Sequence, residues 1–77
     1  MNKNGIVQSV HFSKQYWTKA SSERKLKDMG HTAIKPVHIT AHMLEYRISK
    51  PETFHHFATL KRRNGIQIII GFKQAKK

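Results

Sequence analysis

The 77-residue sequence contains no cysteine, which excludes disulfides and fits a reducing compartment. Long apolar runs are also absent. Residues 1–5 lead into no apolar segment of the kind that signal peptides carry, and no stretch approaches the ~20 apolar residues that a membrane span needs. We therefore expect an intracellular or packaged protein that is not secreted by a signal of its own and has no membrane partner.

Acidic residues are scarce as well. The chain has 4 Asp and Glu against 15 Lys and Arg, which gives a net charge of +11 with neutral histidines and a pI near 10.5. An excess of this size implies a polyanionic partner, which is a nucleic acid, an anionic membrane surface or an acidic protein. The 6 histidines add further charge below about pH 6.5.

No group of residues specifies a reaction or a metal site. His38 and His42 flank a predicted turn, and His55 and His56 are adjacent, but there are no cysteines and few carboxylates to complete a metal site. His55 and His56 with Glu52 can be drawn as an acid–base set, but no nucleophile or phosphate loop accompanies it. An RNase-like site built from histidines and lysines is the other enzymatic alternative. We therefore expect no enzyme activity, no cofactor, no metal and no small-molecule substrate.

The most apolar segment of the chain is residues 65–73. One face of an extended strand there carries three isoleucines and a phenylalanine, because successive side chains of a strand point to opposite sides. These residues are Ile66, Ile68, Ile70 and Phe72, and Ile69 lies on the other face. Burial of each such side chain is worth about 1.5–3 kcal/mol. The pattern predicts a strand at the centre of the sheet.

Three further segments are predicted to be strands. In residues 6–12 the alternation places Ile6, Gln8, Val10 and Phe12 on one face. Residues 37–40 form a short second strand that follows Pro36. Residues 43–49 form the clearest amphipathic strand, in which Leu44, Tyr46 and Ile48 share a face.

A helix is predicted from Lys19 to Met29. Thr18 is suited to cap its N-terminus, and Gly30 follows it where a left-handed residue commonly ends a helix. Its apolar stripe is narrow and consists of Ser22, Leu26 and Met29. The helix therefore depends on packing against a sheet.

The sequence is compatible with two kinds of structure in the segment that starts at Pro51. Residues 51–54 can form a helical turn, and residues 56–61 can form a strand that joins the last one through the sequence Arg-Arg-Asn-Gly at 62–65. Asn-Gly between two β-prone segments favours a hairpin. We favour the turn followed by the hairpin.

These elements predict a single α+β domain over residues 1–77, with basic, flexible ends at 1–4 and 74–77. One helix covers one face of a small, mostly antiparallel sheet of four to five strands, in the order β-α-β-β-(turn/β)-β. Ile69 and Met43 lie on the opposite face, where another element would have to bury their apolar side chains. A homodimer through that face or through an edge strand is one way to bury them.

The candidate nucleic-acid-binding residues are cations in three places. They are Lys61, Arg62 and Arg63 at the hairpin tip, Arg24 and Lys27 on the helix, and Lys73 near the C-terminus. Lys and Arg contacts with phosphates release counterions and dominate non-specific affinity. Tyr16 and Trp17 could stack on bases beside Lys14 and Lys19, although packing on the core is the more common role of such a pair.

The order of several segments resembles a pattern in short proteins of viruses. The segment Ser9-Val10-His11-Phe12 leads to Trp17, then to a helix ending in Met29-Gly30, to Tyr46-Arg47, and to a strand from Gly65-Ile66 to Ile70-Gly71. Over residues 6 to 72 this is similar to short, largely uncharacterised α+β proteins of bacteriophages and large double-stranded DNA viruses, the Marseillevirus-like giant viruses in particular. The resemblance implies a compact α+β fold and a viral setting, which is the host cytoplasm or nucleus, or the virion. It supplies no activity.

Two functions follow as hypotheses. The first is a small basic viral accessory protein that binds nucleic acid, DNA ahead of RNA, through non-specific phosphate contacts. The second is a homo-oligomeric structural or virion-associated protein whose basic surface contacts an acidic protein partner.

Overall fold

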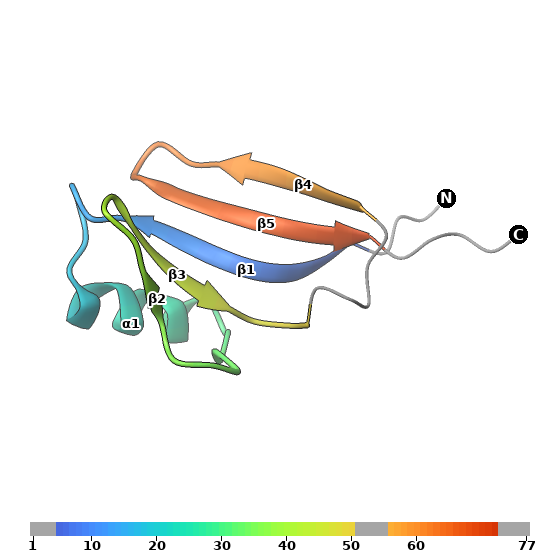
Figure 1. The fold of residues 1–77 in the computed structure, drawn as a ribbon, viewed down its shortest axis with the longest axis horizontal. Helices are drawn as coiled ribbons and strands as arrows, with labels where there is room; N and C mark the ends of the chain where they lie inside the picture. Colours follow the sequence, from blue (N-terminus) through green and yellow to red (C-terminus); the bar gives the residue numbers. More distant parts are fainter. Residues whose placement is uncertain (1–4, 51–55, 73–77) are drawn as a thin grey trace, which may run out of the picture.

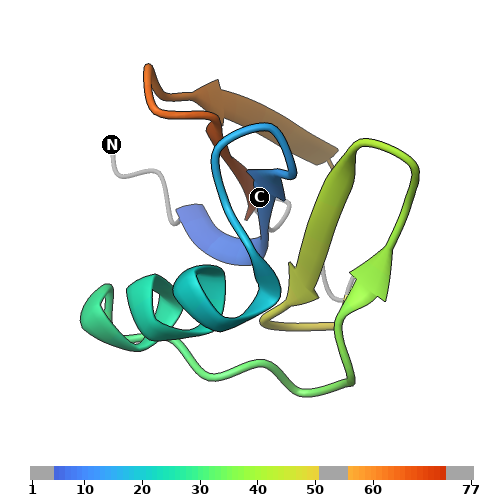
Figure 2. The same cartoon turned by 90° about the vertical axis from the view of Figure 1, so that its left-hand side faces the viewer.

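The computed structural model describes residues 5–50 and 56–72. Its elements are β1 (Gly5–Ser13), α1 (Lys19–Asp28), β2 (His38–Ile39), β3 (Met43–Arg47), β4 (His56–Lys61) and β5 (Ile66–Phe72). The five strands form one antiparallel sheet in the order β2-β3-β1-β5-β4. Helix α1 lies against one face of this sheet (Figures 1 and 2). The predicted α+β fold with one helix is confirmed.

The middle strand of the sheet is β1, not β5. β1 pairs with β3 on one side and with β5 on the other, whereas β5 lies between β1 and the edge strand β4. Ile66 and Ile68 of β5 are buried, but Ile69, Ile70 and Phe72 are only half-buried. The isoleucine-rich pattern correctly indicated a buried face. It carried no information on strand order, which is set by the partners on either side.

The core forms where three strands face the helix. Strand register places Val10 between Tyr46 and Ile68, and Phe12 between Leu44 and Ile66. Val10 and Phe12 are fully buried. Leu26 of α1 closes the cluster from above the sheet. The Phe12 ring meets the Trp17 and Tyr46 rings edge-on, with centroids 5.1 and 5.6 Å apart.

Helix α1 has the predicted caps and the predicted buried stripe. The Thr18 hydroxyl accepts from the Ser21 backbone N–H, and the Ser21 hydroxyl accepts from the Thr18 backbone N–H. These two bonds satisfy part of the free N–H groups at the start of the helix. Ser22 is fully buried and bonds the Tyr46 hydroxyl at 2.7 Å, which explains a polar residue in the apolar stripe. The helix ends at Asp28, and Gly30 follows with φ +83°.

The predicted face of the first strand is wrong over its first half. The register of β1 against β5 shifts between Val7 and Ser9, so that Gln8 is an extra residue in a β-bulge. Val7 therefore packs on the core, and Ile6 is 41% exposed. The Gln8 carbonyl accepts hydrogen bonds from the backbone N–H groups that follow β3. Simple alternation in the sequence gives no sign of an inserted residue.

The remaining strands agree with the predictions apart from their lengths. β2 is shorter than the predicted 37–40, and β3 ends at Arg47 instead of residue 49. The 56–61 strand and its hairpin are confirmed, and all six residues of β4 are exposed. The predicted turn at 51–54 and the predicted flexible ends at 1–4 and 74–77 lie outside the described residues.

Candidate nucleic-acid interface

The hairpin tip between β4 and β5 is a tight turn that presents two arginines. The Arg62 N–H donates to the Ile66 carbonyl at 2.8 Å and closes a loop of three residues. Gly65 has φ +80°, and no other type of residue in the described chain has a positive φ. A two-residue type I′ turn needs positive φ at both central positions. The tip is therefore a three-residue hairpin loop with Gly65 in the left-handed position. Arg62 and Arg63 are exposed on it.

This tip is fixed to the β1–α1 connection. The Trp17 Nε1–H donates to the Asn64 carbonyl at 2.8 Å, and the Ser13 N–H donates to the Gly65 carbonyl at 2.8 Å. The Trp17 ring packs on Phe12, so its predicted role as a core anchor is confirmed. Tyr16 has a different role, because its side chain stays 65% exposed.

A third loop joins the same end of the molecule. The Lys14 N–H donates to the His42 carbonyl at 2.9 Å, and Lys14 Nζ donates to the Thr40 carbonyl at 3.1 Å. The β2–β3 turn, the β1–α1 connection and the hairpin tip therefore lie together (left in Figure 1, toward the viewer in Figure 2). We call this surface the basic end. Its exposed cations are Lys14, Lys19, Arg62 and Arg63, and Tyr16 is its exposed aromatic residue.

A groove of about 260 Å³ lies between α1 and the β4–β5 hairpin. Its lining includes the apolar residues Met29, Ile66 and Ile68, together with Lys25 of α1 and Arg62 of the tip. No acidic side chain lines it. The groove thus joins a cation of the helix with one of the hairpin, although the two are far apart in the sequence.

The structure separates several of the six residues predicted from the sequence. Arg62 lines the groove, whereas Lys61 pairs with Gln67 and lies on the sheet face that α1 does not cover. Arg63 is exposed at the tip, and Arg24 is exposed on α1. Lys27 lines a different hollow, beside the loop that follows α1. Lys73 lies outside the described residues.

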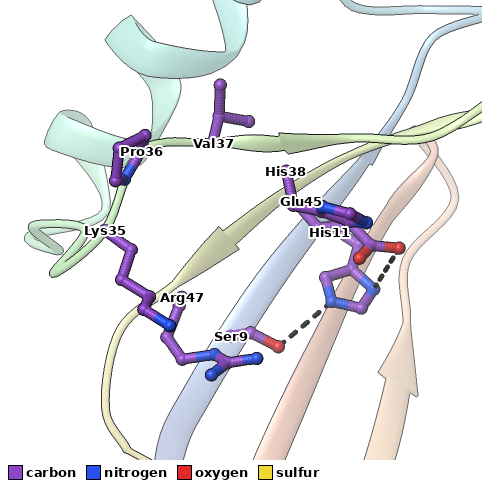
Figure 3. A pocket seen from close by; sticks show the side chains of 8 residues that line it. All are labelled: Ser9, His11, Lys35, Pro36, Val37, His38, Glu45 and Arg47. Atoms are coloured by element: carbon purple, nitrogen blue, oxygen red, sulfur yellow. Dashed lines mark hydrogen bonds and ion pairs between the residues drawn. The ribbon is translucent and has the colours of Figure 1, made fainter.

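Sequence reasoning missed a polar cluster on the uncovered face of the sheet (Figure 3). Ser9 Oγ and His11 Nε2 are 3.1 Å apart, and His11 Nδ1 lies 4.0 Å from Glu45 Oε2. Burial lowers the pKa of His11 below its ordinary value, and the Glu45 carboxylate opposes this. The sequence carries one signal for this cluster, which is that Ser9 and His11 alternate with the core residues Val10 and Phe12. The alternation places Ser9 and His11 on the outer face of the sheet, but it does not show which residues of another strand lie beside them.

Other kinds of site find little support in the part of the chain that the structure covers. Residues 5–50 and 56–72 contain no group of three or more His, Cys, Asp or Glu side chains placed to hold a metal ion. His55 and Glu52, from the acid–base alternative, lie outside the described residues. Within the described ranges, no helix is both long enough and apolar enough to cross a membrane.

Comparison of the chain with protein-family models, with curated proteins and with solved structures finds no match.

Proposed function

We propose that this protein binds nucleic acid, DNA ahead of RNA, through non-specific contacts of Lys and Arg with phosphates. The observation that carries the proposal is the net charge of +11, with exposed cations held on hydrogen-bonded loops at one end of the fold. In keeping with the resemblance to proteins of large DNA viruses, we place this activity in the host cytoplasm or nucleus, or in the virion. The proposal assigns no reaction and no cofactor.

The geometry of the basic end favours it as the main contact surface. Its loops are fixed to one another by the bonds of Ser13, Lys14 and Trp17, so that binding orders little additional backbone. The groove between Lys25 and Arg62 extends the contact to Lys25 of α1 without an acidic residue to repel phosphates. Contacts of this kind position a polyanion but read no base sequence.

The test is affinity for duplex DNA over a series of salt concentrations, measured by fluorescence anisotropy. Log affinity should fall linearly with log salt, by about 0.9 for each neutralised phosphate. In the double variant Arg62→Ala/Arg63→Ala, affinity should fall for all sequences alike, and the slope should decrease by about 2. Affinity that is indifferent to ionic strength would contradict the phosphate mechanism.

The matched control is Arg24→Ala/Lys27→Ala, which removes the same charge from α1. Both residues are exposed, and neither belongs to the basic end or to its groove. A smaller loss of affinity than in the tip variant supports the basic end as the contact surface. Equal losses would show that the overall charge attracts DNA, and would overturn this placement of the interface.

A second candidate function is a homo-oligomeric structural protein with an acidic protein partner. The observation in its favour is the edge strand β4, on which Leu60 remains 43% exposed. Long, apolar edge strands are templates for pairing with another chain. Light scattering before and after nuclease treatment separates the two functions, because oligomers that persist without nucleic acid favour the second.

A further inference from the structure

A pocket with a polar lining opens on the face of the sheet that α1 leaves uncovered. It has a volume of about 520 Å³. Ser9 and His11 of β1 and Glu45 and Arg47 of β3 form its floor, and His38 and Lys35 form its wall (Figure 3). Strand register places these groups side by side, since Ser9 pairs with Arg47, and Glu45 pairs with both His11 and His38. Directly paired side chains of neighbouring strands lie close enough to interact.

The positively and negatively charged side chains of the pocket lie at opposite ends of it. Figure 3 shows Lys35 and Arg47 at one end and Glu45 beside His11 at the other, with the Ser9 hydroxyl between them. Glu45 is the sole carboxylate of the lining, and it lies 4.0 Å from the His11 ring. The two cations therefore share their end without an acidic partner in the lining. Like charges brought together favour an anion between them.

The hydrogen bond between Ser9 and His11 connects this cationic end to a titratable group. When His11 is neutral with its proton on Nδ1 toward Glu45, Nε2 accepts the Ser9 hydroxyl proton. When His11 is protonated, Nε2–H donates to Ser9 Oγ instead. The Ser9 hydroxyl is then free to donate to an anion beside Arg47.

The groups around His11 come from each neighbouring element. Glu45 and Arg47 lie on β3, and His38 and Lys35 lie in and before β2. On the other side, the partner of His11 on β5 is the uncharged Gln67, and Lys61 lies one strand further on β4. His11 is half-buried, and burial lowers its pKa, so its charge can respond to an anion that binds beside it.

We propose that this pocket binds the tetrahedral oxyanion of a phosphate group against Arg47 and Lys35, and that binding is coupled to protonation of His11 through Ser9. The site is separate from the basic end and does not depend on the nucleic-acid binding proposed above. Charge-assisted hydrogen bonds from a guanidinium and an ammonium group are the usual means of holding such an anion.

The test follows the His11 ring by NMR during titration with sulfate, whose charge stays constant over the range in which histidine titrates. Sulfate should raise the pKa of His11. By linkage it should bind ~tenfold more tightly at about pH 5.5 than at about pH 8. His11 resonances that do not respond to sulfate would overturn the proposal.

Three variants locate the site. Arg47→Ala should weaken sulfate binding by about tenfold at both pH values, and Arg47→Lys should restore part of it if the fold is intact. Ser9→Ala should keep the binding and lose most of its pH dependence. Arg24→Ala, on the opposite layer of the molecule, removes the same charge and should change nothing. If Arg24→Ala and Arg47→Ala weakened sulfate binding equally, net charge alone would explain the binding, and the proposed site would be overturned.

Competition identifies the source of the phosphate group. Displacement of sulfate by thymidine 5′-monophosphate but not by a thymidine oligonucleotide of blocked ends supports a terminal phosphate of a small compound. Displacement by the oligonucleotide as well supports a backbone phosphate of a nucleic acid. Failure of both to displace bound sulfate would contradict a site for phosphate groups.

Discussion

At the scale of single residues, two glycines share a backbone conformation but differ in their surroundings. Gly30 has φ +83° and Gly65 has φ +80°, and L-residues rarely adopt either value. A Cβ at Gly30 would meet nothing within 4 Å. A Cβ at Gly65 would lie 2.7 Å from Tyr16 Cδ2 and 3.1 Å from Ser13 Cβ. The hairpin tip can therefore approach the β1–α1 connection because Gly65 has no side chain.

This pair of glycines supplies a stability prediction with an internal control. Gly30→Ala should cost about 1–3 kcal/mol of unfolding free energy from backbone strain alone, and Gly65→Ala should cost more because its methyl group also displaces Tyr16. Urea unfolding of the two variants measures the difference. Adding Tyr16→Ala should narrow that difference by relieving the contact. Equal costs for the two glycines in the wild-type background would contradict a close fit at the tip.

At the scale of secondary structure, the elements that could be predicted are those with local signals. Thr18 and Gly30 mark the ends of α1, and the Asn64-Gly65 pair marks the hairpin, because caps and turns depend on neighbouring residues. The face of residues 6–8 and the position of β5 were predicted wrongly. Both depend on distant partners: Val7 pairs with Ile70 and Ser9 with Ile69, which leaves Gln8 without a partner on β5, and β4 takes the edge beside β5.

The proposed homo-oligomer can be tested at the edge strand β4. Its six residues are exposed and carry one full charge, at Lys61. Leu60→Lys should abolish any homo-oligomer, because a charge on an edge strand opposes pairing. Static light scattering of nuclease-treated protein measures this.

The matched control for that variant is Ile39→Lys on the opposite edge strand. Ile39 is 52% exposed, yet β2 has only two residues to pair with another chain. Oligomers should persist in this control. If Leu60→Lys leaves the oligomer intact while Ile39→Lys dissolves it, association runs through β2. A protein that is monomeric at all salt concentrations would exclude the edge pairing altogether.

At the scale of the whole molecule, the total charge was readable from the sequence but its arrangement was not. Lys25 and Arg62 line one groove because α1 packs beside the β4–β5 hairpin, and Lys61 is turned away from Arg62 by the alternation of β4. The pocket that we propose to bind a phosphate group was missed for the same reason. Ser9 and Arg47 are 38 positions apart and become neighbours only through the pairing of β1 with β3.

A net charge of +11 on 77 residues also predicts that salt acts in opposite directions on the free protein and on its complex with DNA. Self-repulsion destabilises a compact state of high charge, and salt screens it, with a Debye length of about 10 Å at 0.1 M. The melting temperature of the free protein should therefore rise by a few degrees as sodium chloride increases, since about 1 kcal/mol shifts it by roughly 4–8 °C in a domain of this size. Chloride is the appropriate salt, because sulfate is the probe of the proposed pocket.

Bound DNA should raise the melting temperature most at low salt, because stabilisation by a ligand grows with the ratio of its concentration to its dissociation constant. That increment should shrink as chloride weakens the phosphate contacts. Over one chloride series, the melting temperature of the free protein should therefore rise and that of the complex with a duplex should fall, so that the two values converge. A DNA increment that is constant across the series would show that phosphate charge does not hold the complex. A free protein whose melting temperature falls with chloride would show that repulsion among its cations does not limit its stability.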